Sequence, residues 1–397
     1  MRNLFEISEK LVNSVDITHI RPQISWLLQN ERMIGIKGSR GVGKTTLLLQ
    51  FARKYLVDKE PFIYVSLDNL YFSENKFIDF ADDYVKNGGK YLLVDEIHHY
   101  PGWSQELKNI FDTLPELKII YTGSSLLHLL KGRSDLSRRS VTHNLPGLSL
   151  REYINITAKT EFPVFTLPEI LRSHTILAKN VWNVVKPVQH FKDYIETGYY
   201  PFFLENRTNY HRKLGEVVLQ VLENDMPLMA GVSRSNINKL KQLLYVISES
   251  APFKPNIEKL SDRIGISRNT LKDYIYYLNE ALLIASLTSG SKGISRLSKP
   301  DKIYLQNTNL MFAITGPSSD PGNLRETFFL NQVSVKHRIG YTQICDFMVD
   351  DQILFEIGGK NKSRRQIKGM ENAFLAIDNI ETGYLNEIPL WLFGFLY

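Results

Sequence analysis

Residues 38–45 read Gly38-Ser39-Arg40-Gly41-Val42-Gly43-Lys44-Thr45 and fill the pattern G-x-x-x-x-G-K-[ST] without a mismatch. The apolar residues 33–36 precede this stretch, as in a buried strand, and residues 46–53 follow it with helical character. Glycines allow a backbone to curl until its N–H groups converge on one anion. The stretch therefore predicts a phosphate-binding loop between a strand and a helix.

Such a loop divides the work of binding a triphosphate among its residues. The helix presents its N–H groups and positive dipole end to the phosphates, Lys44 reaches the β- and γ-oxygens, and the Thr45 hydroxyl ligates Mg²⁺. We expect one continuous run to bind ATP: Gly38, Ser39, Arg40, Gly41, Val42, Gly43, Lys44, Thr45 and Thr46.

A second element lies about fifty residues later, where the apolar residues 91–94 end in Asp95 and Glu96. This looks like a Walker B strand, in which Asp95 holds Mg²⁺ and Glu96 polarises the attacking water as general base. The competing interpretation, a solvated strand end, loses weight because a phosphate loop precedes it. We therefore predict ATP hydrolysis, with Lys44, Asp95 and Glu96 as the catalytic residues.

Two neighbouring features have weaker patterns. The strand-like residues 118–125 end in small hydroxyl side chains, and Thr122 or Ser124 could sense the γ-phosphate, although both also suit helix caps. His98 and His99 follow the carboxylates without a third ligand at metal-binding spacing. We expect both histidines at the surface or in a supporting position.

Length and composition set broad limits on the class of protein. The chain has 397 residues, 43% of them hydrophobic, and a net charge of +6, which predicts two or three globular domains and suits an anionic partner. A solvated basic surface explains the charge equally well. The single Cys345 excludes an internal disulfide, and no apolar stretch approaches a membrane span. We expect a cytoplasmic location and no membrane partner.

Alternating strands and helices in the N-terminal part predict an α/β fold, a P-loop NTPase parallel sheet with helices on both faces. The predicted strands are 33–37, 61–67, 90–95, 117–122 and 140–145, and the predicted helices are 44–56, 103–113 and 124–131. Past Pro146 the spacing of the apolar residues has the period of a helix. We divide the chain into an ATPase domain at 1–160, a helical and winged-helix domain at 161–300 and a smaller α+β domain at 301–397.

A helix-turn-helix is predicted at residues 257–275, with Gly265 in the turn and Ser267 capping the second helix. Residues 282–287 have the pattern of a strand that starts a wing. As candidate DNA contacts we name Arg268, Asn269 and Lys272, at the start of the second helix. That helix continues with three tyrosines suited to packing, so a structural or docking role is the alternative.

The sequence resembles a prokaryotic family of AAA-like P-loop ATPases with a C-terminal DUF4143-type region. The similarity rests on Asp95-Glu96-Ile97 followed by Pro101 and Trp103, on Tyr121-Thr122-Gly123-Ser124-Ser125, and on Arg139 followed by Leu145-Pro146-Gly147-Leu148-Ser149-Leu150-Arg151-Glu152. The resemblance implies an ATPase in which Arg139 is a phosphate sensor. This chain has Arg138 where the family has Gly.

The same resemblance implies a C-terminal domain of the PD-(D/E)xK nuclease type. Its metal-binding carboxylates would be Glu326, Asp346 and Glu356. Its lysine position holds Gly358, although Lys360 or Lys362 could approach from the loop. We expect a nuclease-like fold without activity, retained for packing or partner recognition.

The function predicted from all these features is an AAA-like molecular switch that binds ATP, hydrolyses it with Mg²⁺, and couples its nucleotide state to C-terminal interaction domains. Candidate partners besides ATP are nucleic acid, another protein and further copies of the chain. Two alternatives stay open, namely a DNA-binding protein that senses ATP and an ATP-gated, Mg²⁺-dependent nuclease.

Overall fold

The computed structural model describes residues 2–126, 136–250, 252–289, 300–316, 320–363, 367 and 369–397. The chain divides into two compact units, residues 1–146 with 228–230, and residues 147–227 with 231–397. Among the described helices, none combines the length and apolar character needed to cross a membrane.

The first unit contains a five-stranded parallel sheet in the order β2-β3-β4-β1-β5. Its strands are β1 (Met33–Gly38), β2 (Phe62–Ser66), β3 (Tyr91–Asp95), β4 (Lys118–Ser124) and β5 (Val141–Asn144). Gly38 pairs with Ser124, and Ser66 pairs with Asp95, so the carboxyl ends of four strands meet at one edge of the sheet. All five predicted strands are confirmed within two residues at either end.

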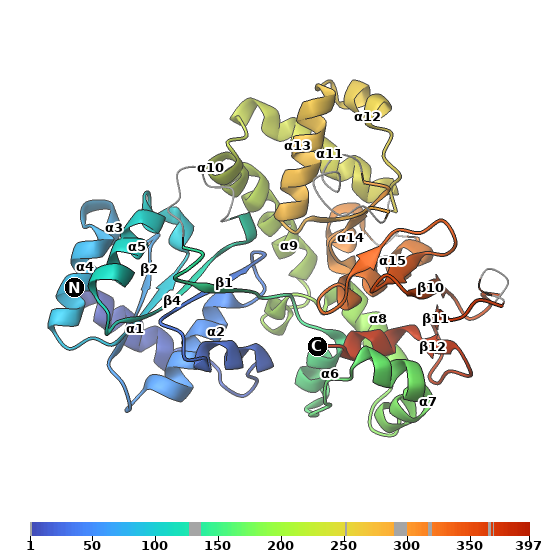
Figure 1. Cartoon of the computed structure of the whole chain (residues 1–397), viewed down its shortest axis with the longest axis horizontal. Helices are drawn as coiled ribbons and strands as arrows, with labels where there is room; N and C mark the ends of the chain where they lie inside the picture. The colour runs from blue at the N-terminus through green and yellow to red at the C-terminus, as the bar shows by residue number, and fades with distance from the viewer. Residues whose placement is uncertain are drawn as a thin grey trace. The chain divides into compact units, whose positions relative to one another are not determined.

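Helices cover both faces of this sheet, because right-handed crossovers from β1 to β2 and from β3 to β4 run in opposite directions. Figure 1 shows α2 and α5 on opposite sides. The helical segments are α1 (Arg2–Ser14), η1 (Pro22–Leu28), α2 (Lys44–Phe51), η2 (Ala52–Leu56), α3 (Tyr71–Glu74), α4 (Phe77–Lys86), η3 (Ile97–His99) and α5 (Trp103–Thr113).

Apolar side chains fill the space between the sheet and the helices α4 and α5. Phe77 and Phe80 from α4, and Leu107 from α5, are buried against the strand residues Leu92 and Val94. This packing fixes β3 in the middle of the unit and thereby fixes the carboxylate at its end. The predicted helix 124–131 lies mostly outside the described residues, from residue 127 on.

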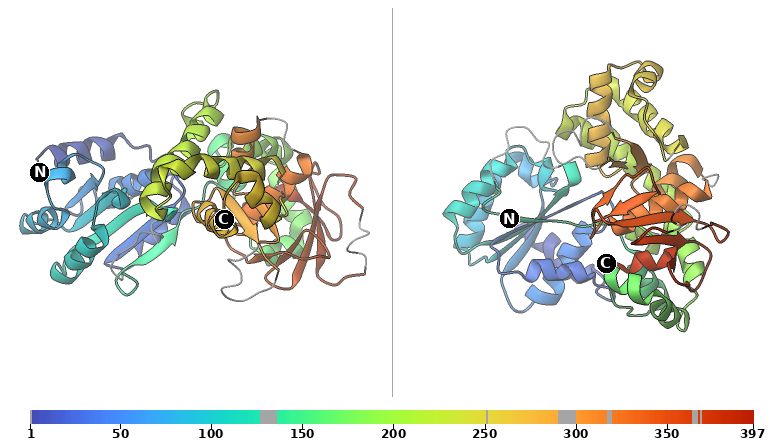
Figure 2. Two further views of the ribbon diagram at one scale, coloured as in Figure 1. Left: turned by 90° about the horizontal axis from the view of Figure 1, so that it is seen from above. Right: turned by 45° about the vertical axis from the view of Figure 1, so that its right-hand side comes forward.

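The second unit combines helices with two small sheets, which Figure 2 shows from two sides. Its helical segments, the last residues of α10 excepted, are α6 (Leu150–Ala158), α7 (Leu167–Trp182), α8 (Pro187–Thr197), η5 (Pro201–Leu204), α9 (Tyr210–Gln220), η6 (Val221–Asp225), α10 (Met226–Ala230), η7 (Arg234–Asn236), α11 (Ile237–Ser250), α12 (Ile257–Ile264), α13 (Arg268–Glu280), α14 (Thr308–Thr315), α15 (Pro321–Val333) and η11 (Leu390–Phe395). Its strands are β6 (Ile284–Leu287), β7 (Lys302–Leu305), β8 (Ile339–Gly340), β9 (Phe347–Val349), β10 (Ile353–Gly358), β11 (Ala373–Ile377) and β12 (Glu387–Pro389).

Helix α6 was expected to close the ATPase domain but packs within the second unit. Ser149 caps α6, and its hydroxyl also donates to the Tyr397 carbonyl oxygen over 2.8 Å. The Leu150 N–H donates to the Gln332 side chain on α15 over 3.2 Å. These contacts explain why the compact first unit ends at Pro146. The division into three domains stays a prediction.

The helix-turn-helix forms from α12 and α13 as its caps require. Gly265 adopts φ 71°, a left-handed conformation that ends α12, and the Ser267 side chain accepts from the Thr270 N–H to start α13. Leu271 and Leu278 on α13 are buried, so this helix faces a core. Strands β6 and β7 pair antiparallel beside it.

The last sheet of the second unit has the order β12-β11-β10-β9-β8. Strand β10 is parallel to β11 and antiparallel to β9. Phe329 on α15 stacks on Phe347 of β9 and contacts Phe355 of β10, with ring centroids 5.3 Å and 4.9 Å apart. The predicted small α+β region is therefore confirmed in its architecture.

Candidate functional site at the carboxyl edge of the parallel sheet

Two glycines give the loop between β1 and α2 its curvature. Gly41 has φ 86° and Gly43 has φ 93°, both in the region that L side chains rarely adopt. At Gly38 the constraint is space, because an added Cβ would lie 2.5 Å from the Leu145 carbonyl oxygen. The pattern of glycines in the sequence thus follows directly from the shape of the loop.

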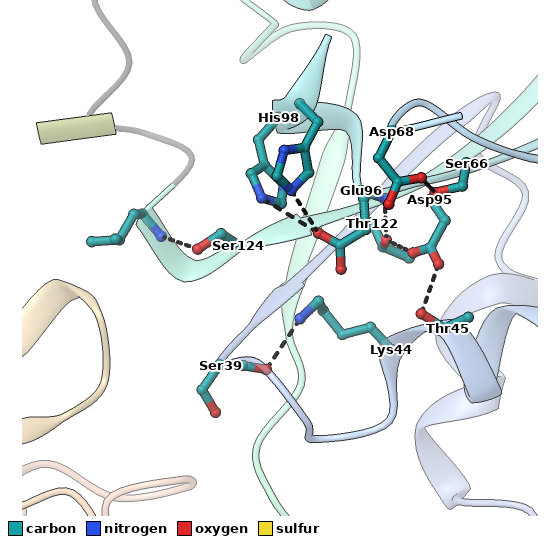
Figure 3. A network of polar contacts seen from close by, with 12 residues as sticks. Ser39, Lys44, Thr45, Ser66, Asp68, Asp95, Glu96, His98, Thr122 and Ser124 are labelled. Carbon is teal, nitrogen blue, oxygen red and sulfur yellow. Dashed lines mark hydrogen bonds and ion pairs between the residues drawn. The ribbon is translucent and has the colours of Figure 1, made fainter. Parts of the chain in front are cut away.

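Lys44 is the first residue of α2, and its ammonium lies over the loop. It is buried, and its Nζ donates to the carbonyl oxygens of Gly38 and Ser39, each over 3.1 Å, the second of which Figure 3 shows. A buried lysine needs such acceptors to offset the loss of water. The contacts hold the charge beside the N–H groups of the loop, where phosphate oxygens would replace the carbonyls as partners.

Asp95 is the centre of the site, and three hydroxyls donate to its buried carboxylate. Thr45 Oγ1 and Tyr64 OH donate to Oδ2 over 2.7 Å and 2.8 Å, and Thr122 Oγ1 donates to Oδ1. The donors come from α2, β2 and β4, and Figure 3 shows Thr45 and Thr122 beside Asp95. Sequence reasoning missed Tyr64, because only the pairing of β2 beside β3 brings it to Asp95.

This donor set fits a small divalent cation. Carboxylate and hydroxyl oxygens are the ligands that Mg²⁺ prefers. The Asp95 carboxylate and the Thr45 hydroxyl, 2.7 Å apart, would both be available to it. Beside nucleotide phosphates, a Mg²⁺ ion bound here would neutralise negative charge on the phosphate oxygens.

Glu96 follows directly, with a backbone that departs from the strand. Its φ of 49° is left-handed, and its N–H donates to Thr122 Oγ1 over 3.2 Å. Burial raises the pKa of the Glu96 carboxyl, and the charge of Asp95 adds to the rise, whereas Lys44 and Arg40 oppose it. A raised pKa suits a general base, because it makes the carboxylate a better proton acceptor.

His98, the first of the two histidines after Glu96, is buried and not at the surface, and a supporting position for it stays a prediction. The His98 side chain is only 1% exposed, and burial lowers its pKa to about 3. His99 is partly exposed. The two histidines have a third titratable group beside them, the Glu96 carboxylate, which the spacing in the sequence did not indicate. Its Oε2 lies 3.3 Å from His98 Nε2.

The structure separates the three candidate sensors. Thr122 contacts both Asp95 and Glu96, while Ser124 ends β4 and accepts from the Leu126 N–H over 3.3 Å. Arg139 precedes β5, which runs parallel to β1, so it lies at the opposite edge of the sheet from the loop. There it forms a bidentate ion pair with Asp112 at 2.8 Å and 2.9 Å. We therefore do not retain Arg139 as a sensor.

The carboxylates named in the C-terminal region lie around a lysine. Asp346 Oδ2 accepts from the Ile357 N–H over 2.8 Å, and Lys362 Nζ lies 2.5 Å from Glu356 Oε1. Glu326 on α15 accepts from Tyr304 OH over 2.6 Å. Burial raises the pKa values of Glu326 and Glu356, and the charge of Asp346 raises both further.

Lys362 occupies the space beside the position that lacks a lysine. A Cβ added at Gly358 would lie 2.5 Å from Lys362 Cβ and Cγ. The glycine therefore makes room for a lysine that reaches the same carboxylate from the loop. From the sequence, either Lys360 or Lys362 could approach the carboxylates. The ion pair with Glu356 identifies Lys362 as the lysine that does so.

The candidate DNA contacts lie together on the first turns of α13. Arg268 and Asn269 are exposed, and Lys272 is partly buried. Arg268 pairs with Glu258 on α12, which offsets its charge. Much of the excess positive charge predicted to suit an anionic partner lies at residues 131–139 and 360–368. The first of these stretches lies mostly outside the described residues, and the second lies partly outside them.

Two family profiles match this chain. Residues 30–154 match a family described as "AAA domain". Residues 188–320 match a "Domain of unknown function (DUF8612)", which corrects the expected DUF4143-type region. With the strand order and the loop geometry, the first match gives the N-terminal unit the P-loop NTPase fold.

Similar proteins extend this picture only in outline. An uncharacterized protein of Methanocaldococcus jannaschii is 26% identical over 392 residues, which cover 90% of this chain and 82% of that protein. AMPPCP-bound DnaA from Aquifex aeolicus is 18% identical, with a TM-score of 0.27 over 70% of this chain and 88% of that chain. C. elegans PCH-2 is 14% identical, with a TM-score of 0.25 over 70% of this chain and 66% of that chain. At these TM-scores neither solved structure bears on activity.

Proposed function

We propose that this protein is an AAA-like ATPase that hydrolyses ATP with Mg²⁺ and acts as a molecular switch. One observation carries the proposal, namely the contacts that join Thr45, Asp95, Thr122 and Glu96 across three elements of the fold. These contacts support the proposal because they bring Asp95 and Glu96 together, and the charge of Lys44 acts on Glu96. A solvated strand end would not gather three hydroxyl donors on one buried carboxylate.

The residues have separable roles in this mechanism. The loop N–H groups and Lys44 bind the β- and γ-phosphates, and Thr45 and Asp95 would hold Mg²⁺, which would supply positive charge to the phosphate oxygens when bound. Glu96 accepts a proton from the attacking water, and its backbone is held in place by the N–H that donates to Thr122 Oγ1. Among the described residues, Thr122 is therefore our candidate for the γ-phosphate sensor, since it contacts both Asp95 and the N–H of Glu96.

The test separates binding from chemistry. Lys44→Ala should abolish binding of a fluorescent ATP analogue, with the exposed Lys86→Ala as the matched control. Glu96→Gln should keep binding and lose steady-state phosphate release, with Glu60→Gln, which alters an exposed ion pair, as its control. Turnover by Glu96→Gln equal to that of the parent would refute Glu96 as the base.

The switch itself requires that nucleotide in the first unit change the second unit. We expect ATP, held by the Glu96→Gln variant, to alter amide hydrogen exchange in α12 and α13. The Lys44→Ala variant with the same ATP is the control. Identical exchange patterns with and without ATP would mean an ATPase that is not coupled to the helix-turn-helix.

One specific observation favours DNA as a partner of this region, because Arg268 and Asn269 are exposed at the start of α13. Salt-dependent binding to duplex DNA should weaken in Arg268→Ala and Lys272→Ala. Exposed Lys213→Ala, on α9, is the control. If no DNA binding occurs at low salt, a structural or protein-docking role of α13 is favoured.

A second candidate function, an ATP-gated nuclease, is favoured by the Lys362 ammonium 2.5 Å from Glu356. With Asp346 beside them, these groups could hold Mg²⁺ and activate water. Plasmid nicking with Mg²⁺ or Mn²⁺ that disappears in Asp346→Ala and Lys362→Met would support it. Nicking that survives both substitutions, or none at all, would exclude this site and leave a role in packing or recognition.

A further inference from the structure

Three side chains after β3 bring one nitrogen or oxygen each to a common point. Glu96 Oε2 lies 3.3 Å from His98 Nε2 and 3.9 Å from His99 Nε2. All three ligand atoms lie within 4.8 Å of one another. Around a tetrahedral Zn²⁺ with bonds of about 2.0–2.1 Å, neighbouring ligand atoms are separated by about 3.3 Å. The triangle therefore needs only small side-chain rotations to close on an ion.

His98 supplies a second, independent observation. Its side chain is 1% exposed, yet neither ring nitrogen makes a hydrogen bond. Buried polar groups in proteins almost always have a partner, and an exception needs a reason. Figure 3 shows the His98 ring beside the Glu96 carboxylate. A bound cation would give Nε2 a ligand bond in addition to its contact with the Glu96 carboxylate 3.3 Å away.

The donor set distinguishes this point from the Mg²⁺ site. Two imidazoles with one carboxylate suit Zn²⁺, Co²⁺ or Mn²⁺, whereas Mg²⁺ prefers oxygen ligands such as those of Thr45 and Asp95. Two His and one Glu would leave at least one coordination position for water. The positive charges of Lys44 and Arg40 act on His98 and would limit the affinity.

We propose that Glu96, His98 and His99 form a regulatory site for a divalent transition metal, which inhibits hydrolysis by binding the carboxylate of the general base. The inhibitory part rests on the proposed function, because it requires Glu96 to be the base. Binding exchanges water ligands of the hydrated metal for the three protein ligands, releases these waters to solvent and involves no electron transfer. ATP binding should persist, since Lys44 and Thr45 are not ligands.

Co²⁺ absorption spectroscopy tests the site without reference to activity. The purified full chain should bind one Co²⁺ with visible d–d bands that are lost in His98→Ala and in His99→Ala. Because His99 is partly exposed, its substitution is not expected to disturb folding. His337→Ala, which alters an exposed pair with Asp350, is the control among the nine histidines. Unchanged bands in His99→Ala would overturn the proposal.

Inhibition is measured separately. Zn²⁺ added to the Mg²⁺-ATPase assay should reduce turnover of the parent at least tenfold at a concentration that leaves His99→Ala nearly unaffected. Equal sensitivity of the two proteins would overturn the inhibitory role. If the parent shows no turnover at all, the proposed ATPase function fails, while the Co²⁺ bands still decide whether the metal site exists.

Discussion

Thr122→Val removes one hydroxyl and keeps the shape of the side chain, so it tests the polar contacts around Asp95. Thr122 is fully buried, and its Oγ1 both donates to Asp95 and accepts from the Glu96 N–H. A hydrogen bond to a charged group contributes about 1.5–3 kcal/mol, and a neutral one contributes about 1 kcal/mol. We therefore expect the free energy of unfolding to fall by about 2–4 kcal/mol.

The matched control is Thr113→Val at the end of α5. Its hydroxyl is exposed and donates to the Asn109 carbonyl oxygen of its own helix over 2.8 Å, so we expect a change below about 0.5 kcal/mol. Native-state hydrogen exchange of amides in β3 and β4 measures both values. ATP turnover should fall at least tenfold in Thr122→Val, because the base loses its orienting contact. Equal stabilities of the two variants would refute the reasoning.

Four further changes probe other parts of the account. Gly43→Ala should cost about 1–3 kcal/mol of stability, measured by urea unfolding, because it forces a side chain into φ 93°. Lys44→Ala should fold like the parent in the same assay while losing nucleotide affinity by at least a hundredfold in equilibrium titrations. Burial raises the pKa of the Glu96 carboxyl in the folded state, so ionisation of this carboxyl at higher pH lowers the stability of the folded state. Glu96→Gln removes this cost and should raise the thermal unfolding midpoint near pH 8. The difference in midpoint between variant and parent should vanish towards pH 4. The pH–rate profile of the parent should likewise fall on its acid side at a pKa above the ordinary glutamate value. Lys362→Met should lower stability by about 1–3 kcal/mol, since it leaves the buried Glu356 carboxylate without its hydrogen-bonding partner, and an unchanged melting temperature would contradict that pairing.

The sequence was sufficient for the parts of the fold that depend on local pattern. The glycines and Lys44 of the loop predict its shape, since few other residues adopt φ near 90°. The apolar run ending at Asp95 predicts a buried strand, and Ser267 predicts the start of α13. In each case short-range chemistry decides the outcome.

The contacts that depend on strand order could not be read in the same way. Tyr64 reaches Asp95 only because β2 pairs with β3, and Arg139 misses the loop because β5 is parallel to β1. The left-handed turn at Glu96 folds its carboxylate back towards His98, which no spacing rule reveals. Lys362 fills the space beside Gly358, the position where the nuclease pattern has its lysine. A motif search cannot predict this, because Lys362 lies at a different position in the sequence.

The most direct test of the central claim is steady-state ATP hydrolysis by the purified chain with Mg²⁺, measured beside the Glu96→Gln variant, with binding of an ATP analogue determined for both. We expect turnover in the parent, loss of turnover in the variant and equal binding by the two proteins. Parent protein that binds the analogue tightly yet releases no phosphate, or a variant that hydrolyses as fast as the parent, would contradict it.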